Sequence, residues 1–195
     1  MAGVRYTRAE ARGRLPVHPD CRCHWIVVIP RRKEKPKVPK WKPTMTAKEA
    51  EVWAKDSRIQ ETVFHGTSMS KANEIKEAGF ALRQKAIGGK FLGDGVYVTS
   101  DKKMAKGFAS AAKELGIGKA KTLSLKVNIK NPYIFQSYAD GDRFFTFLDR
   151  ENIPSRDIPK FLKSLGYDAL DAREFSPDFG INIFNPKNLT VIKGE

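Results

Sequence analysis

Residues 63–68 join an apolar run to a histidine and a glycine, a combination that can do chemistry. His65 is the only one of the three histidines that lies outside residues 1–45. An imidazole nitrogen can hydrogen-bond a ribose hydroxyl, and Gly66, without a side chain, lets its N–H and C=O approach a carboxamide closely. Thr67 follows directly. We expect this strand end to bind a ligand, the plainer alternative being a hydrogen-bonded core histidine.

A second group follows about 26 residues later, where Gly93 and Gly95 flank a turn that leads into a strand with Tyr97. The helix predicted after that strand carries Phe108. Two aromatic rings can form the walls of a slot, because flat rings stack favourably on a flat heteroaromatic group such as a pyridinium. Considered singly, each aromatic has the alternative of being a core residue, and each glycine of only shaping a turn.

The order and spacing of these groups resemble the ADP-ribosyltransferases of the diphtheria-toxin and poly(ADP-ribose) polymerase type. That family has a strand ending in His-Gly-Thr or His-Gly-Ser, then a Gly-x-Gly-[Ile/Val]-Tyr strand and a helix with a second aromatic. The resemblance covers roughly residues 60–193. It implies that His65 binds a ribose 2′-hydroxyl, that the Gly66 backbone holds the nicotinamide carboxamide, and that Tyr97 and Phe108 sandwich the nicotinamide ring. NAD is then a substrate, and no metal is required.

The family's third motif, a glutamate that opens a late strand, is incomplete in this chain. Aligning residues 184–186, Phe-Asn-Pro, with the motif puts Gly180 where the glutamate is expected. Cleavage of a glycosidic bond passes through an oxocarbenium-like species, which a nearby carboxylate stabilises, and glycine offers no such group. Strand alternation puts Asn182 on the same face as Gly180. Three carboxylates could also substitute in part: Asp171, Glu174 and Asp178.

These motifs define two overlapping sets of predicted site residues. The catalytic set is His65, Tyr97 and Asn182. The NAD-binding set is His65, Gly66, Thr67, Tyr97, Phe108 and Gly180.

The front of the chain carries a different motif. Residues 15–23, Leu-Pro-Val-His-Pro-Asp-Cys-Arg-Cys, are similar to the closing segment of phage head-morphogenesis, or minor capsid, proteins. The cluster His18, Cys21, Cys23 and His24 offers ligands that zinc accepts, but its Cys-x-Cys spacing is tighter than that of usual zinc sites. We therefore expect a local turn and no metal. The resemblance implies a phage-encoded protein that associates with the capsid.

Positive charge is concentrated at the front of this 195-residue chain. Residues 1–45 hold 12 Lys and Arg against 3 Asp and Glu, out of a formal net charge of +14. This excess predicts salt-sensitive contact with nucleic acid through residues 1–45, the alternative being a solvated basic linker. No run approaches the roughly 20 apolar residues of a membrane span, and the start lacks a secretory-signal layout. We expect no membrane contact and a location in the virion, the host cytoplasm or both.

Three segments are expected: a segment at 1–29 that the resemblance makes capsid-protein-like, a linker at 30–45 that is rich in Pro and Lys, and a folded domain at 46–195 that the apolar pattern predicts. Within the domain, a capping box of Thr46 and Glu49 starts a helix that runs to about residue 57, and Ser100 is the predicted cap of another helix. The predicted helices are 47–57, 70–78, 101–115, 141–150 and 155–165, and the predicted strands are 62–65, 95–99, 123–129, 167–172, 181–184 and 189–192.

These elements predict an α+β domain, and the resemblance specifies it as a split β-sandwich of two small antiparallel sheets with flanking helices. The expected activity is NAD-dependent mono-ADP-ribosyl transfer to a host protein or nucleic acid. NAD hydrolysis and transfer to an RNA 2′-phosphate are alternatives, of which the latter fits poorly because only one core histidine is present. A catalytically silent module that binds NAD or ADP-ribose, favoured by Gly180, and a structural capsid component are the alternatives from other classes.

Overall fold

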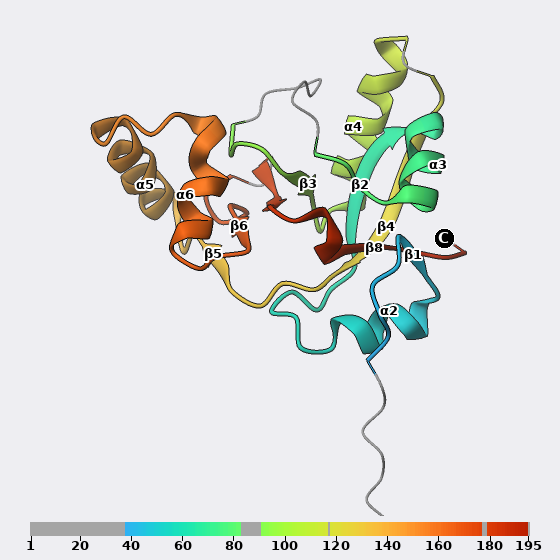
Figure 1. Ribbon diagram of the computed structural model, residues 1–195. Helices are drawn as coiled ribbons and strands as arrows, with labels where there is room; N and C mark the ends of the chain where they lie inside the picture. The colour runs from blue at the N-terminus through green and yellow to red at the C-terminus, as the bar shows by residue number, and fades with distance from the viewer. Residues whose placement is uncertain (1–37, 83–90, 117, 177–178, 195) are drawn as a thin grey trace, which may run out of the picture. The chain divides into compact units, whose positions relative to one another are not determined.

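The computed structural model describes residues 38–82, 91–116, 118–176 and 179–194 (Figure 1). These residues form an α+β fold with two four-stranded sheets and helices beside them, which confirms the predicted fold class. The predicted capsid-like segment 1–29, the first part of the linker, and the candidate ligands His18, Cys21, Cys23 and His24 lie outside the described residues.

The first sheet has the strand order β1-β8-β4-β2. Its strands are β1 (Thr44–Met45), β8 (Leu189–Ile192), β4 (Ala120–Val127) and β2 (Val63–Ser68). Only the short β1–β8 pair is parallel, and β2 pairs with β4 along its whole length, from Val63 opposite Leu125 to Ser68 opposite Ala120. Strand β2 is therefore at an edge of this sheet.

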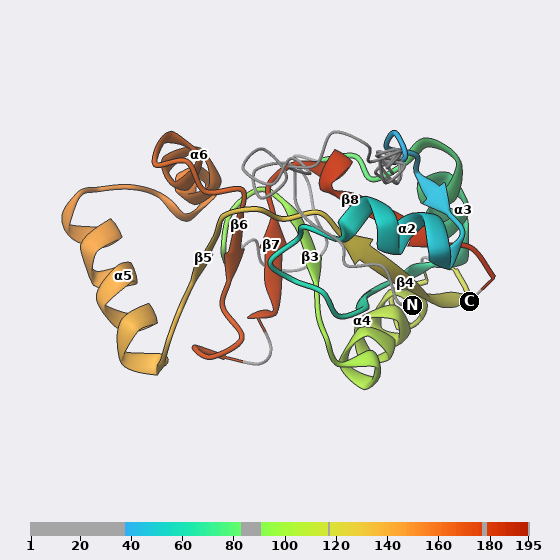
Figure 2. The same ribbon diagram turned by 90° about the horizontal axis from the view of Figure 1, so that it is seen from below.

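The second sheet has the strand order β3-β7-β6-β5, and Figure 2 shows these strands side by side. They are β3 (Val96–Val98), β7 (Ile181–Ile183), β6 (Ala169–Asp171) and β5 (Pro132–Ile134), of which β5 and β6 are parallel. The two sheets meet where Phe64 of β2 bridges Thr99, just after β3. This junction joins the strand of the first motif to the strand of the second.

Five α-helices accompany the sheets: α2 (Ala47–Ala54), α3 (Met69–Ala78), α4 (Lys102–Glu114), α5 (Tyr138–Arg150) and α6 (Ile158–Ser164). Short 3-10 turns at Ser155–Asp157 and Pro186–Asn188 precede α6 and β8. The predicted capping box of α2 is present, with both reciprocal hydrogen bonds between Thr46 and Glu49. The predicted cap Ser100 of α4 is wrong. Asp101 caps this helix instead, because its carboxylate accepts from two free N–H groups of the first turn.

The folded part extends a few residues ahead of Thr46. Met45 is 1% exposed and packs with Trp53, and the Trp41 indole N–H donates to the carbonyl of Leu189 at 2.8 Å. Strand β1 adds main-chain bonds to β8, among them Val191 N–H to Pro43 C=O at 2.9 Å. The end of the predicted basic linker is thus attached to the edge of the first sheet.

Two large apolar clusters form most of the core, beside the smaller one that contains Met45 and Trp53. One is aliphatic and lies on both sheets, with Val63, Val98, Leu123 and Ile181 among its buried members. The other is rich in aromatic rings and packs α5 and α6 against the second sheet; its buried members are Leu92, Phe135, Phe144, Leu148, Ile158, Leu162, Leu170, Ala172 and Phe184. The first cluster supports the junction of β2 with β3, and the second lies under the turn that precedes β3.

Candidate functional site

His65 and Tyr97 are joined directly across the junction of the two sheets. Nδ1 of His65 lies 2.8 Å from the carbonyl oxygen of Tyr97. Because a carbonyl only accepts, this contact puts the ring proton on Nδ1 and leaves Nε2 of the neutral ring as an acceptor. Burial lowers the pKa of His65, and the Tyr97 carbonyl opposes this only in part. His65 is therefore a neutral acceptor near pH 7, as a ribose hydroxyl requires. Thr67 follows it by alternation on the same face of β2.

Gly66 lies where α4 crosses β2. A Cβ at this position would come within 1.9 Å of the Ala105 carbonyl oxygen and 2.8 Å of the Ala109 amide nitrogen. Only glycine therefore lets the helix backbone approach the strand this closely. This close packing is a structural reason for the glycine that the sequence pattern did not reveal.

The N–H and C=O of Gly66 point to the outer edge of β2. Phe64 exchanges both its main-chain bonds with Thr99, at 2.7 and 3.0 Å, on the side away from β4. Alternate residues of a strand direct these groups to the same side, so those of Gly66 also point away from β4. The chain leaves the sheet after Thr99 and enters α4 at Lys102. This geometry suits the predicted contact of Gly66 with a carboxamide.

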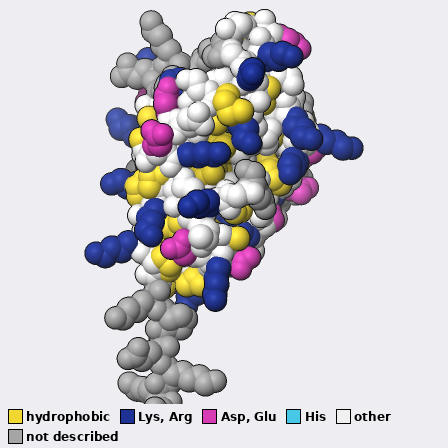
Figure 3. Space-filling model, turned by 90° about the vertical axis from the view of Figure 1, so that its right-hand side faces the viewer, with side chains coloured by type: hydrophobic (Ala, Val, Ile, Leu, Met, Phe, Trp, Pro, Cys, Tyr) yellow, Lys and Arg dark blue, Asp and Glu magenta, His cyan; other side chains and the backbone are white. Residues whose placement is uncertain are grey.

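Phe108 is 56% exposed on α4. Lys106 and Ser110 of this helix line a hollow with residues 120–122 of β4, so this flank of α4 faces β4. At 100° per residue, Phe108 is on the opposite flank, on the side of the outer edge of β2. Phe108 is thus on the side of α4 toward which the main-chain groups of Gly66 point. Lysine and arginine side chains are frequent on the face of the molecule around α3 and α4 (Figure 3).

Tyr97 is half-buried and held at its hydroxyl. The hydroxyl accepts from the N–H of Leu92 and donates to the carbonyl of Gly93, both at 2.9 Å. Burial raises the pKa of Tyr97 to about 12, so the phenol stays protonated at ordinary pH. These bonds fix the ring against the turn 92–95. Tyr97 is thereby suited to serve as a rigid wall rather than as an acid or base.

Asn182 lies beneath the same turn and is fully buried. Its Nδ2 donates to the carbonyl of Leu92 at 2.8 Å, and a Cβ on Gly95 would come within 1.6 Å of its Oδ1. That oxygen is buried and has no hydrogen-bond partner among the described residues. This location lets Asn182 support the turn 92–95, and its predicted contact with substrate stays a prediction. Strand alternation does not extend to Gly180, which precedes β7 and has a left-handed backbone, and it gave no sign that the turn covers Asn182.

Gly180 has a backbone conformation that disfavours any side chain. Its φ is +59°, in the left-handed region, and a Cβ would lie 2.4 Å from the carbonyl oxygen of Val98. A glutamate placed here would need the strand junction to shift. The glycine at this position therefore has a local structural reason, and the side chain missing from the third motif cannot be restored without strain.

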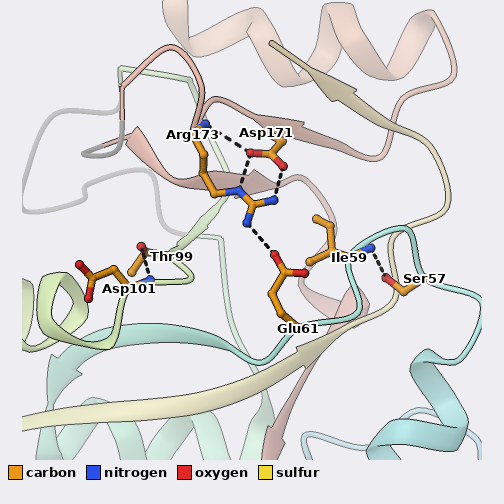
Figure 4. A network of polar contacts seen from close by, with 7 residues as sticks. All are labelled: Ser57, Ile59, Glu61, Thr99, Asp101, Asp171 and Arg173. Atoms are coloured by element: carbon orange, nitrogen blue, oxygen red, sulfur yellow. Dashed lines mark hydrogen bonds and ion pairs between the residues drawn. The ribbon is translucent and has the colours of Figure 1, made fainter. Parts of the chain in front are cut away.

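Three charged residues connect the two sheets beside this point (Figure 4). Arg173 donates from Nε and Nη2 to the two carboxylate oxygens of Asp171, at 2.8 and 2.6 Å, and from Nη1 to Glu61 at 2.6 Å. Asp171 ends β6 and is 5% exposed, whereas Glu61 precedes β2. The predicted substitute Asp171 is thus occupied by the guanidinium, and Glu174 is exposed. The predicted substitute Asp178 lies outside the described residues.

The network favours the charged forms of Glu61 and Arg173. Burial alone would raise the pKa of Glu61, but bonds from its own backbone and from Arg173 outweigh it and lower this pKa. The two carboxylates raise the pKa of Arg173 further above its ordinary value. No local pattern in the sequence indicates this network, because Glu61 and Arg173 are 112 residues apart.

Two hollows of the surface are lined by residues other than His65, Tyr97 and Phe108. One, of about 270 Å³, is between α5 and α6 and is lined mainly by apolar residues; the other is the hollow between α4 and β4. In the described part of the chain, no group of three or more His, Cys, Asp and Glu could hold a metal. None of the helices described is both long and apolar enough to cross a bilayer.

Comparison of the chain with protein-family models, with curated proteins and with solved structures found no match. The functional argument therefore depends on the residues themselves and on the resemblance of their motifs.

Proposed function

We propose that residues 38–195 are an NAD-dependent mono-ADP-ribosyltransferase domain that acts on a host macromolecule, protein or nucleic acid. The observation that carries the proposal is the His65–Tyr97 contact at the junction of β2 and β3, next to the outer edge of β2. His65 supplies an imidazole acceptor and Gly66 its main-chain groups, while Tyr97 packs against the turn 92–95 and Phe108 is exposed on α4. These are the contacts that the ribose, the carboxamide and the pyridinium of NAD require.

In the proposed reaction, Nε2 of His65 accepts a hydrogen bond from a ribose hydroxyl, and Gly66 pairs with the carboxamide through its N–H and C=O. Tyr97 and Phe108 hold the nicotinamide ring flat between them. The bond between the ribose C1′ and the ring nitrogen breaks, and its electron pair neutralises the pyridinium. A nucleophilic oxygen or nitrogen of the acceptor then bonds to C1′ and loses its proton to solvent.

The alternative function is binding of NAD or ADP-ribose without transfer. Gly180 is the observation that favours it, because its left-handed backbone and the nearby Val98 carbonyl exclude the carboxylate expected there. Asp171 is committed to Arg173. An oxocarbenium-like species would then lack its usual stabilising charge, so the proposed transfer is slow unless the acceptor supplies that charge.

The experiment incubates the full chain with NAD labelled in the adenylate part, together with host lysate. Nicotinamide release and label on the protein and RNA fractions are followed separately. Transferase activity predicts release together with label on one fraction, and hydrolysis predicts release alone. If neither occurs but NAD raises the melting temperature, the domain is a binding module. Absence of all three signals contradicts both functions.

The capsid resemblance of residues 1–29 supports a further part of the proposal. A transferase carried at the end of a virion-associated polypeptide would enter the host cytoplasm with the genome. A purely structural capsid component is the remaining alternative, and the His65–Tyr97 contact gives it no support. This association predicts that the full chain is detected in purified virions and is absent from capsids that lack the minor capsid protein.

A further inference from the structure

The lysines between residues 102 and 126 hold the excess positive charge of the folded domain. Residues 46–195 contain 24 Lys and Arg against 19 Asp and Glu, and the segment 102–126 alone contains seven Lys against one Glu. The rest of the domain, with 17 basic and 18 acidic residues, is close to neutral. The charge that could attract an anionic partner is therefore local to α4, β4 and the turn between them.

This segment folds around the hollow between α4 and β4, which has a volume of about 350 Å³. Lys106 and Ser110 line it from the helix, Lys121 and Thr122 from the strand, and two alanines complete the lining. Ammonium and hydroxyl groups are donors that suit phosphate oxygens. This open hollow thus combines positive charge and hydrogen-bond donors in one place.

The lysines in and beside the hollow form no ion pair with any residue that the structure describes. Lys106, Lys113 and Lys119 are exposed, and among the described residues neither they nor Lys121 form an ion pair. Neighbouring ammonium groups repel one another when no anion lies between them. An anion in the hollow would relieve this repulsion, which makes the surface a ready binding site for repeated negative charges.

The types of side chain that line the hollow favour a phosphodiester strand over a lipid membrane as its partner. A nucleic-acid backbone presents regularly spaced phosphates that a basic groove can follow. A membrane is flat, and the helices that lie on it add apolar side chains beside their lysines. Here the lining residues are lysine and small side chains, whereas Phe108 and Leu115, the large exposed apolar residues of α4 and its C-terminal end, are on the opposite flank.

We propose that the hollow between α4 and β4 binds the sugar-phosphate backbone of nucleic acid. This binding goes beyond the proposed function, because it needs neither NAD nor the residues of β2 and β3. A strand in the hollow lies across α4 from the outer edge of β2, separated from it by the width of one helix, about 10 Å. The same domain can therefore hold a nucleic acid close to the proposed NAD site.

The test measures binding of a fluorescein-labelled 20-nucleotide single-stranded DNA to the full chain by anisotropy, from 50 to 200 mM NaCl. The variant K106Q/K121Q removes two charges from the hollow. The matched control K160Q/K187Q removes two exposed lysines from α6 and from the turn before β8. Both variants keep residues 1–45, so the basic front contributes equally. Melting curves of both variants check that the fold is retained.

We expect K106Q/K121Q to reduce the slope of log affinity against log salt by about 1.4, since each phosphate contact on a single strand contributes about 0.7. Between 50 and 200 mM NaCl, the affinity of the wild type then falls by a factor about seven times larger than the affinity of K106Q/K121Q does. The control K160Q/K187Q keeps the wild-type slope. Equal slopes for the two variants overturn the proposal. Loss of binding to phosphatidylserine-containing vesicles by K106Q/K121Q, with DNA binding unchanged, overturns it in favour of a membrane surface.

Discussion

Replacing Gly180 by glutamate tests whether the third motif can be completed in this fold. A left-handed backbone costs a residue with a side chain about 1–2 kcal/mol. The Cβ contact with the Val98 carbonyl, at 2.4 Å, adds about 1–3 kcal/mol as overpacking. We therefore expect Gly180→Glu to lower the free energy of unfolding by about 2–5 kcal/mol, without gain of transferase activity.

Gly166 provides the matched control, because its φ of +88° is also positive but a Cβ added there would meet nothing within 4 Å. Urea unfolding of Gly180→Ala and Gly166→Ala separates the two costs, since only the first variant has the clash. Gly180→Ala should lose about 1–3 kcal/mol more than Gly166→Ala. Equal losses, or a Gly180→Glu variant that is stable and more active in nicotinamide release, would refute the reasoning.

Three further predictions concern the junction of the sheets. Gly66→Ala should lower the free energy of unfolding in urea strongly, by at least about 3 kcal/mol, because its Cβ meets the α4 backbone at 1.9 Å; an unchanged urea midpoint contradicts the packing of α4. Because burial lowers the pKa of His65, its contribution to stability is complete above about pH 6.5 and is lost as the pH falls below it. Melting curves should show this loss in the wild type and not in His65→Gln. Glu61 has a lowered pKa, so its contribution is complete above about pH 4.5 and disappears at lower pH, and Glu61→Gln should flatten acid unfolding in that range.

Local signals in the sequence were sufficient for much of the fold. The capping box of Thr46 and Glu49 acts within one helical turn, and the predicted helix 70–78 corresponds to α3, which ends at Gly79. Strands β1 and β5, of two and three residues, were not among the predicted strands. They form because distant partners, β8 and β6, supply the hydrogen bonds.

Residue types and spacing were enough to select the candidate site, but not to predict the surroundings of its residues. The spacing of His65 and Tyr97 identified two residues that the structure joins by one hydrogen bond. The positive φ of Gly180 and the turn covering Asn182 depend on tertiary contacts, which a single sequence does not encode locally. The link from Glu61 through Arg173 connects distant segments and could not be inferred from either one.

Binding of NAD to the full chain is the measurement that tests the central proposal most directly. Isothermal titration calorimetry should show saturable binding to the wild type and about tenfold weaker binding to His65→Ala, the loss of one buried hydrogen bond of about 1.4 kcal/mol. His65→Gln, whose amide can still bond the Tyr97 carbonyl, checks that the fold persists. No binding to a folded wild type, or equal affinity for His65→Ala, would contradict a nicotinamide site at the outer edge of β2.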